Sequence, residues 1–450
     1  MYSATTMPRI VRYVLNERGW TRTPNDTNNW TLKWKCGSIS PSDYRNALNH
    51  QILNHFPETR ALTKKGSLQY TMKLSHLKYP NLYNFTPTAF TLTEYSLPLL
   101  QKYFGNKNKI WIGKPAAWSQ GRGITITRNL EDFLPSLVLK PPAETLEELP
   151  EASTGLGEDE AAAGAAASPS QELQPHFSPY MVIIQEYIQN AHLIGGYKHD
   201  MRIYVLITSL APLRVYLYNE GLARFSTQPY SLDDLDTLRH LTNTSIHHSM
   251  FQSGKLDPAA QEVFSGTVDA LLGPGDFSKR CLSSVFGYLA QGGVDARRIW
   301  REIQKVILLT VLPIAKNARP SHNQKFELLG FDIILTDDLK PHLIEVNLGP
   351  SLAIACQTDI IIKKALVEDI FNIVFSTPPN SRRFPSLHED NGFESDIPKS
   401  SGDFELIFPF NENTYSASSR ISQAIESDEN YDLIMDEIDK MSPPPSCIPK

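Results

Sequence analysis

The chain has 450 residues, of which 41% are hydrophobic and 20% are charged, a composition typical of a soluble globular protein with two or three domains. Its four cysteines lie far apart, without the spacing of a zinc site, and the N-terminus does not resemble a signal peptide. We therefore expect free thiols in a reducing compartment. The apolar stretch at residues 306–315 is about half of the roughly 20 residues that a membrane span requires, which argues against a membrane protein.

The formal net charge of −6 is unevenly distributed. Residues 140–178 carry −7 and residues 376–450 carry −8, which leaves +9 on the rest of the chain. A basic body favours a negatively charged partner, either a nucleic acid or an acidic polypeptide. Chance asymmetry would explain the same pattern equally well.

Residues 1–85 form the first predicted region, an N-terminal domain. Residues 9–15 (RIVRYVL) are rich in β-branched residues and predict a short strand. Residues 28–35 form a Trp-rich patch, and residues 64–77 show the apolar spacing of a helix.

Residues 86–182 form a second, central region. The segment at 109–127 predicts a strand, a loop and another strand. Residues 140–179 are rich in Pro, Ala, Gly and Glu and contain few large apolar residues, so we expect a disordered acidic insertion that loops out of this domain.

Residues 183–375 form a third, C-terminal region with a predicted hairpin at 199–221 and a predicted helix at 363–374. Residues 376–450 read as a disordered acidic tail without a catalytic role, although residues 419–441 have the pattern of a short acidic amphipathic helix. Strands and helices interleave without a regular βαβ repeat, which favours an α+β fold over a doubly wound sheet.

A second hairpin is predicted within residues 330–350, and polar residues interrupt its apolar strands. If residues 336–341 form its loop, Asp332 faces Glu345, and Asn347 points to the same side because side chains alternate along a strand. Three oxygen-bearing side chains would then converge, an arrangement suited to Mg²⁺ in a nucleotide enzyme. The alternative is a polar hairpin face exposed to water.

A second row of polar residues lies in the segment YKHDMRIYV. Lys198, Asp200, Arg202 and Tyr204 are spaced two apart, so they share one face of a strand. Alternating charges also keep an exposed edge strand soluble. Beside a metal hairpin, the row suits a site that binds ribose and phosphates.

Lys114, followed by the turn Gly121-Arg122-Gly123, is a weak phosphate-binding signal. Glycines let a backbone approach phosphate oxygens closely, and a lysine supplies a compact charge for them. A plain turn explains these residues as well. Arg224 and the segment HLTN (residues 240–243) carry no information individually.

Taken in order, the motifs IWIGKPAAWSQGRGI, IIQEYI, YKHDMRIYV, HLTN, ELLGFDIIL and IEVNLGPS resemble the tubulin–tyrosine-ligase-like family, an ATP-grasp branch. The resemblance covers about residues 10–375. It implies an ATP-grasp-like α+β fold with N-terminal, central and C-terminal domains, nucleotide between the last two, and ATP-dependent ligation of an amino acid to tubulin tails.

The resemblance also implies roles for individual residues. It places at the ATP site Lys114, Gln120, Gly121, Arg122, Gly123, Ile124, Gln185, Glu186, Tyr187, Ile188, Lys198, Asp200, Thr242 and Asn243. It places at the Mg²⁺ ion Asp332, Glu345 and Asn347. Arg202 and Arg224 would be catalytic, and the free amino acid would contact Arg224, Ser245 and Lys363.

The general pattern is most similar to the polyglutamylases, so we expect free L-glutamate as the second substrate. Where these enzymes usually have Tyr-Ser-x-Asn-Lys after HLTN, this chain has Thr244, Ser245, Ile246, His247 and His248, and Gly349 replaces a usual serine. A neutral histidine would weaken a carboxylate clamp. The alternatives are a non-catalytic tubulin-tail or microtubule binder, and a glycylase or other ligase acting on another acidic protein.

The resemblance also sets expectations for partners and location. We expect acidic tubulin C-terminal tails rather than a nucleic acid or a membrane, in the cytoplasm on microtubules, with the cilium or basal body as a specific site. Because the tail is acidic where autonomous polyglutamylases have a basic microtubule-binding extension, we also expect a helper subunit.

Overall fold

A computed structural model of the chain describes residues 1–4, 6–23, 28–93, 96–116, 118, 121–135, 182–243, 258–276, 278–316, 318, 323–376, 400–410, 412–420 and 427–440. The predicted insertion at 140–179 lies outside the described residues. So do some of the residues singled out from the sequence: Gln120, Thr244, Ser245, Ile246, His247 and His248.

The N-terminal region builds a small parallel sheet. Its strands run in the order β1 (Tyr2–Ala4), β2 (Leu32–Trp34), β3 (Ile52–Leu53) and β12 (Gln324–Lys325). Its helices are α1 (Arg9–Glu17), α2 (Pro41–Asn46), α3 (Arg60–Thr63) and α4 (Lys65–Lys78), with a 3-10 turn at Pro57–Thr59. Because β12 comes from much later in the chain, the N-terminal region is tied to the C-terminal one through a shared sheet.

The strand predicted at residues 9–15 is wrong, because this segment forms α1. Its buried residues, Ile10, Val11, Val14 and Leu15, are spaced as one face of a helix and pack into a core shared with α12 (Gln357–Ser376). Burial against a neighbouring helix outweighs the β-preference of these side chains. The helix predicted within residues 64–77 is confirmed as α4.

The central region forms an antiparallel sheet in the order β4 (Ala89–Thr91), β7 (Val182–Glu186), β5 (Trp111–Pro115) and β6 (Thr125–Thr127). The two strands predicted within residues 109–127 are therefore confirmed as β5 and β6. Helix α5 (Leu97–Phe104) and a 3-10 turn at Leu130–Phe133 cover the sheet around the buried Trp111. Strand β7 runs from residue 182 to residue 186, so the predicted boundary between the central and C-terminal domains falls inside a strand.

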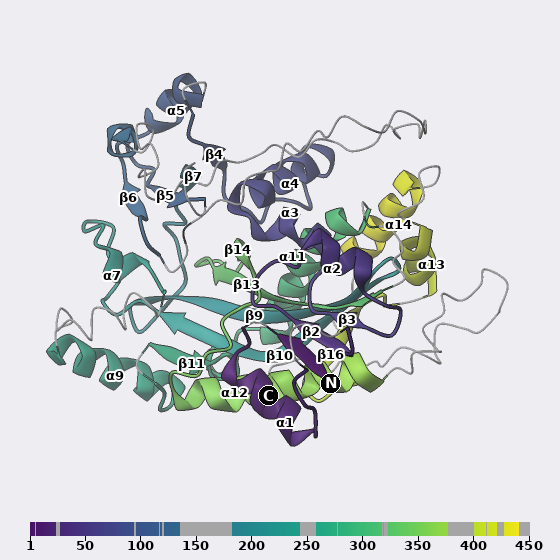
Figure 1. Cartoon of the computed structure of the whole chain (residues 1–450). Coiled ribbons are helices and arrows are strands. Elements are labelled where there is room, and N and C mark those ends of the chain that lie inside the picture. Colours follow the sequence, from purple (N-terminus) through teal and green to yellow (C-terminus); the bar gives the residue numbers. More distant parts are fainter. Residues whose placement is uncertain are drawn as a thin grey trace.

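The third sheet has eight antiparallel strands and occupies the middle of the molecule (Figure 1). Its main path is β14 (Pro341–Leu348), β13 (Glu327–Leu335), β9 (Tyr197–Leu210), β10 (Leu213–Phe225), β16 (Phe404–Phe408) and β15 (Ser400–Ser401). Strand β11 (Lys279–Cys281) pairs with β10, and β8 (Leu193–Ile194) pairs with β9. The predicted hairpin at 199–221 is confirmed as β9 and β10. One small parallel sheet and two antiparallel sheets, with interleaved helices, make the fold α+β.

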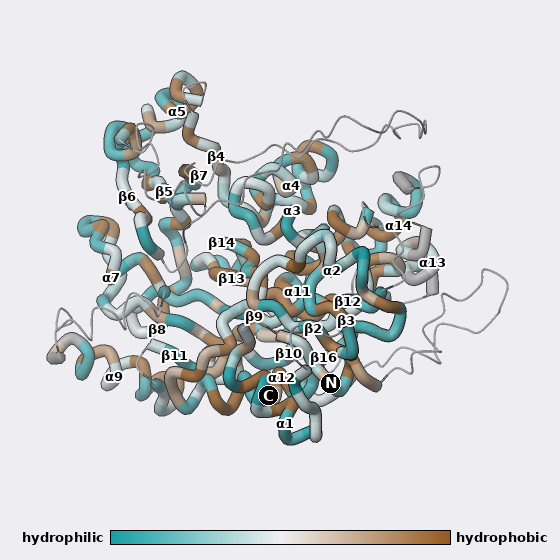
Figure 2. The backbone as a smooth tube through the Cα atoms, in the orientation of Figure 1, coloured by the Kyte–Doolittle hydropathy of each residue, from teal (hydrophilic) through white to brown (hydrophobic). Residues whose placement is uncertain are grey.

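The two faces of this sheet bury different residues of β9. Met201, Ile203 and Val205 pack in the core that contains α11 (Ala296–Lys316), a largely hydrophobic helix in Figure 2. Tyr204 lies on the opposite face, in the core formed with α1 and α12, which includes the predicted helix at 363–374. The remaining helices are α7 (Thr237–His240), α9 (Pro258–Leu272), α10 (Leu282–Gln291), α13 (Glu412–Arg420) and α14 (Ser427–Asp439).

The prediction of a disordered tail from residue 376 is wrong for its described parts. Strand β16 pairs with β10 and extends the large sheet. Helix α14 packs on α11, with Ile434 and Ile438 fully buried and Tyr431 stacked on Tyr79 of the N-terminal region. Enough apolar surface is buried to offset the ordering entropy of a segment whose average composition is acidic. The alternative prediction of an amphipathic helix within residues 419–441 is confirmed as α14.

Two expectations from composition concern the cysteines and membrane spans. Cys36, Cys281 and Cys356 are free thiols, and Cys447 lies outside the described residues. Within the described ranges, no helix is both long enough and apolar enough to cross a membrane.

Candidate functional site

The hairpin of β13 and β14 brings three polar side chains together. Asp332 and Glu345 are direct partners in the register, as predicted, and Asn347 is the partner of Gly330. The Asn347 Nδ2 atom lies 3.3 Å from Asp332 Oδ2 and 3.2 Å from Glu345 Oε1. The predicted convergence of these side chains is therefore confirmed. Ile344 is an extra residue that shifts the register beyond Asp332, so the loop covers residues 336–340.

Two arginines surround Asp332, which is only 2% exposed. Arg202 donates from Nε to Asp332 Oδ1 at 2.5 Å and from Nη2 to Oδ2 at 3.0 Å. Arg224 Nη2 lies 2.8 Å from Asp332 Oδ2. Burial alone would raise the pKa of Asp332, but the charges of Arg202 and Arg224 outweigh it and hold the pKa well below its usual range. Asp332 is thus a permanently charged, preorganised oxygen donor.

Arg224 also links Asp332 to Asp200 of β9. It donates to the two Asp200 oxygens at 2.7 and 2.6 Å, and Thr242 Oγ1 donates to Asp200 Oδ2 at 2.6 Å. These contacts follow from the sheet register, because Arg224 and Asp200 are cross-strand partners. The predicted residues Asp200, Arg202, Arg224, Thr242 and Asp332 therefore form one network of buried charges.

Two buried lysines, Lys114 of the central sheet and Lys198 of β9, lie beside this network. Lys114 of β5 donates to Gln185 of β7 at 2.7 Å, and burial lowers its pKa to about 8, against the opposing effect of Glu345. Lys198 donates to the Tyr187 hydroxyl at 2.5 Å, and burial lowers its pKa to about 7. Cations with lowered pKa values in a buried cluster are typical of sites that bind anionic ligands.

The sequence did not single out His240 as a partner of this group. Its Nδ1 atom lies 2.8 Å from the Tyr187 hydroxyl, and Lys198 Nζ lies 4.1 Å from the centroid of the Tyr187 ring. His240 Nε2 in turn lies 2.8 Å from the backbone oxygen of Asp234. Strand β9, through Lys198, and helix α7, through His240, thus both position Tyr187. A residue pattern within one segment does not reveal such contacts.

The glycine loop after β5 has the conformation that its glycines predict. Gly121 has φ of +73° and Gly123 has φ of +66°, values that favour glycine. A Cβ atom on Gly123 would lie 2.7 Å from the Trp118 ring, and Lys65 of α4 donates to the Trp118 backbone oxygen at 2.7 Å. The loop is therefore anchored to the N-terminal region, with Arg122 exposed.

Two of the predicted residues lie apart from this network. Glu186 pairs with Lys109 at 2.8 Å, next to Gln185 on β7. Lys363 of α12 contacts Asp359 Oδ1 at 2.7 Å and the Ala353 backbone oxygen at 2.6 Å.

Lys363 belongs to a second buried charge group that sequence reasoning did not find. Lys279 of β11 lies 2.8 Å from the fully buried Asp359, which therefore pairs with two lysines. Lys279 is the cross-strand partner of Arg224. Charges of both groups act on Tyr204: burial raises its pKa, the charge of Arg202 opposes this and the charge of Asp359 adds to it. The two groups are thus electrostatic neighbours.

The hairpin residues fit a magnesium ion by the chemistry of their donors. Mg²⁺ bound with nucleotide phosphates needs only one or two carboxylates from the protein. Asp332 and Glu345 supply two, and the Asn347 amide already bridges them. The described residues, the hairpin included, contain no group of three or more His, Cys, Asp or Glu side chains that could hold a metal ion.

Comparison with known proteins decides the family. A family model described as the tubulin-tyrosine ligase family matches residues 43–271 and 276–383, more than half of the chain. The chain belongs to the tubulin-tyrosine ligase family. The resemblance read from the sequence motifs is thereby confirmed. The matched ranges contain every candidate site residue named above, whereas β16, α13 and α14 lie beyond them.

The family members most similar to this chain include named polyglutamylases. The chain is 34% identical over 381 residues to the human "Probable tubulin polyglutamylase TTLL2", a match that covers 82% of this chain and 55% of that protein. It is 34% identical over 379 residues to mouse "Tubulin polyglutamylase TTLL6", with 81% and 38% covered. For mouse "Tubulin polyglutamylase TTLL5" the identity is 29% over 380 residues, with 82% and 24% covered. The chain thus spans little more than half the length of these relatives, or less.

Proposed function

We propose that this protein is an ATP-dependent ligase that joins a free amino acid to side-chain carboxylates of tubulin C-terminal tails, with L-glutamate as the amino acid. The observation that carries the proposal is the buried network of Lys114, Lys198, Asp200, Arg202, Arg224 and Asp332 beside Glu345 and Asn347. Family membership and the printed names of the relatives support the same reaction and substrate.

The reaction proceeds in two steps that these residues suit. An oxygen of the acceptor carboxylate attacks the γ-phosphorus of ATP, ADP leaves, and an acyl phosphate forms. The neutral amino group of the free amino acid then attacks the acyl carbon, and phosphate leaves as the amide forms. The nitrogen gives up one proton and keeps one as the amide N–H. The protein mainly positions the reactants and stabilises charge.

Each group of residues has a distinct role in the proposal. Asp332, Glu345 and Asn347 hold Mg²⁺, which when bound neutralises phosphate oxygens. Lys114 and Lys198 bind phosphates, with the loop from Gln120 to Ile124 beside them and residues 185–188, Thr242 and Asn243 around the nucleoside. Arg202 and Arg224 stabilise negative charge at the reacting centre.

Lys363, together with Arg224 and Ser245, binds the free amino acid in this proposal. The carboxylate of that amino acid would replace part of the ion pairing that Asp359 gives to Lys363 and Lys279. Two lysines on one buried aspartate leave one positive charge without a protein counter-ion in this group, which favours an anionic ligand there.

The acceptor and the location follow from the same proposal. A body with a surplus of positive charge attracts the acidic tails of tubulin. We expect the protein on microtubules in the cytoplasm, including those of cilia and basal bodies. The C-terminal segment, which includes α14, is acidic rather than basic, so we do not expect it to bind the acidic surface of microtubules. We therefore also expect a helper subunit to supply microtubule affinity.

Incorporation of labelled amino acids tests the proposal. The protein is incubated with ATP, Mg²⁺, microtubules and one labelled amino acid at a time, with Glu345→Gln as the control. We expect glutamate incorporation by the natural sequence and none by Glu345→Gln. Incorporation of glycine or tyrosine alone would reject glutamate and keep the ligase. Absence of incorporation together with absence of ATP binding would favour the alternative, a non-catalytic tubulin-tail binder.

A further inference from the structure

A cavity of about 780 Å³ lies between the N-terminal sheet and the loop that follows β14. Three parts of the chain line it: the start of α1, the ends of β2 and β3, and the loop at residues 349–354 with the start of β13. Its volume is in the range of ligand sites, which is about 300–1,000 Å³. None of the roles proposed above makes use of this cavity.

One end of the cavity adjoins the candidate site. Pro350 lines the cavity, and a Cβ atom on Gly330 would lie 2.7 Å from Pro350 and 3.0 Å from the Arg202 side chain. Gly330 therefore packs against both Pro350 of the cavity wall and Arg202, the arginine that binds Asp332. The cavity wall and the candidate site are thus separated by a single layer of residues at this point.

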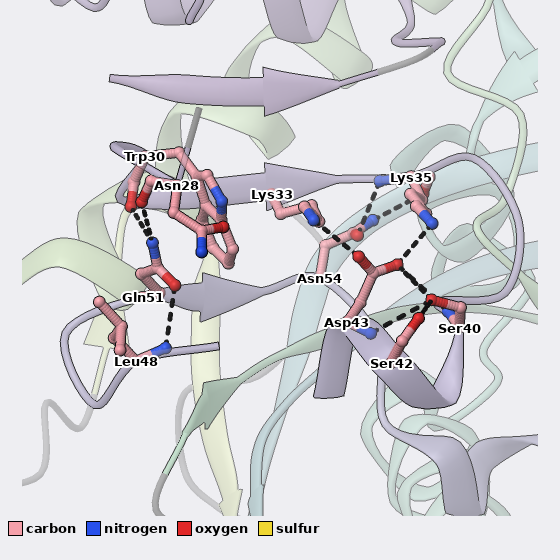
Figure 3. Close-up of polar contacts among 10 residues, drawn as sticks. All are labelled: Asn28, Trp30, Lys33, Lys35, Ser40, Ser42, Asp43, Leu48, Gln51 and Asn54. Atoms are coloured by element: carbon pink, nitrogen blue, oxygen red, sulfur yellow. Dashed lines mark hydrogen bonds and ion pairs between the residues drawn. The ribbon is translucent and has the colours of Figure 1, made fainter. Parts of the chain in front are cut away.

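The cavity wall also carries positive charge. Arg9 is exposed at the start of α1, and Lys35 follows β2. Lys35 and Lys33 lie 2.6 and 2.7 Å from the two oxygens of Asp43, as Figure 3 shows, so one carboxylate serves two lysines. This part of the wall therefore has a surplus of positive charge.

The acidic residue of the cavity wall is already neutralised. Glu327 accepts hydrogen bonds from the Phe56 backbone and from Thr59 Oγ1 at 3.1 and 2.9 Å, and it pairs with His55 Nδ1 at 2.6 Å. A carboxylate with that many donors does not repel an anionic ligand as a free one would.

The wall beside Lys35 is also rigid before any ligand arrives. Asn54 accepts from the Lys35 backbone nitrogen at 2.9 Å and donates to its backbone oxygen at 2.8 Å (Figure 3). The buried side chains of Trp34, Phe326 and Leu352 supply apolar surface around it. A preorganised wall lowers the entropy cost of binding an extended chain.

We infer that this cavity binds the acceptor: an extended, acidic stretch of polypeptide whose carboxylates lie near Arg9 and Lys35 while the carboxylate to be modified lies at the Arg202 end. The inference rests on the proposed function, since it names the path of the acceptor to that site. The positive charges of Arg9 and Lys35 select acidic side chains, and the backbone of the bound polypeptide lies against the apolar wall.

Two matched pairs of variants test the inference. Lys35→Met is compared with Lys33→Met, because both lysines pair with Asp43 but only Lys35 lines the cavity. Arg9→Met is compared with Arg12→Met, which changes an exposed arginine one turn along α1 that does not line the cavity. Thermal unfolding of all four variants controls for folding.

The first measurement is ligation to a synthetic glutamate-rich peptide. We expect Lys35→Met and Arg9→Met each to raise KM for the peptide about fivefold, with KM for ATP and for free glutamate unchanged. Lys33→Met should raise this KM less than Lys35→Met does, because only Lys35 lines the cavity, and Arg12→Met should resemble the natural sequence. If the parent is active and KM for the peptide does not differ within either pair, the inference is overturned while the proposed function stands.

The second measurement does not need turnover. Binding of the fluorescein-labelled glutamate-rich peptide is followed by anisotropy, with the glutamine version of the peptide as control. We expect weaker binding by Lys35→Met and Arg9→Met than by their matched controls, and weak binding of the glutamine peptide to all proteins. Equal binding within each pair would overturn the inference, whether or not the protein ligates an amino acid.

Discussion

Asp332 and Glu345 stand directly opposite each other on β13 and β14, and the Asn347 amide lies within 3.3 Å of both carboxylates. Two like charges on neighbouring strands are unfavourable unless a cation or hydrogen-bond donors meet them. Arg202 and Arg224 pair with Asp332. Burial lowers the pKa of Lys114, and Glu345 is close enough to oppose that shift. The hairpin is therefore built for a positive partner, which connects the fold to the proposed ATP chemistry.

Arg224→Met is expected to destabilise the fold. Its guanidinium pairs with Asp200 and Asp332, which are both buried. Removing it leaves two buried negative charges with one positive partner fewer. The free energy of unfolding should fall by about 3 kcal/mol, measured by urea denaturation. The control is Arg239→Met, whose partner Asp234 is exposed, and which should change stability little. Equal stability of Arg224→Met and the natural sequence would contradict the structural role of this pair.

Ile434→Ala is expected to destabilise the protein through the C-terminal segment. Ile434 of α14 is fully buried in the main core, whereas its neighbour Leu433 is 40% exposed. We expect Ile434→Ala to lower the free energy of unfolding by about 3 kcal/mol and Leu433→Ala to lower it far less. If both substitutions had the same small effect, α14 would not be packed on the body in solution.

Stability should decrease with rising pH because of His55. Burial disfavours its charged form, but the hydrogen bond to Glu327 outweighs this and raises the pKa of His55 above 6.5. The folded state then binds the proton more tightly than the unfolded state does. The stabilisation is complete below the unfolded pKa of about 6.5 and is lost as the pH rises through the folded value, with a slope of at most about 1.4 kcal/mol per pH unit.

The measurement compares the natural sequence with Glu327→Gln by denaturant unfolding between about pH 6 and pH 8.5. The glutamine cannot supply the negative charge that raises the pKa of His55, so the decrease with pH should become smaller. A profile that stays the same in both proteins would show that the pair does not titrate in this range.

ATP binding should take up protons because of Lys198. Burial lowers its pKa to about 7 in the protein without nucleotide, so it is largely neutral at pH 8. Phosphates next to it would favour the charged form and raise that pKa. Calorimetric titrations with ATP in buffers of different ionisation enthalpy should show proton uptake at pH 8, and a smaller uptake for Lys198→Met. The same uptake by both proteins would place the titrating group elsewhere.

The sequence predicts those parts of the site that depend on strand periodicity. The partnership of Asp332 and Glu345 follows from the two-residue alternation and a short loop. The extra residue Ile344 does not follow, because a bulge depends on the surrounding sheet rather than on the local pattern. Residue types also predict that Arg202 and Arg224 are charged, but only the register of β9, β10 and β13 reveals which carboxylates they contact.

The sequence was least informative where packing outweighs local preference. Residues 9–15 contain β-branched side chains and yet form α1, because one helical face meets α12. Strand β16 lies in an acidic segment, and its partner β10 is almost 200 residues away in the chain. Asp359 and its pairing with Lys279 and Lys363 were missed for the same reason: the two lysines come from separate elements, β11 and α12.

The affinity for ATP with and without Mg²⁺, in the natural sequence and in Glu345→Gln, tests the central claim most directly. We expect Mg²⁺ to tighten ATP binding to the natural sequence by tenfold or more, about 1.4 kcal/mol. In Glu345→Gln, with an unchanged unfolding midpoint, that gain should be lost. If Glu345→Gln bound ATP with the same dependence on Mg²⁺ as the natural sequence, the hairpin would not be the metal site and the proposed ligase mechanism would lose its basis.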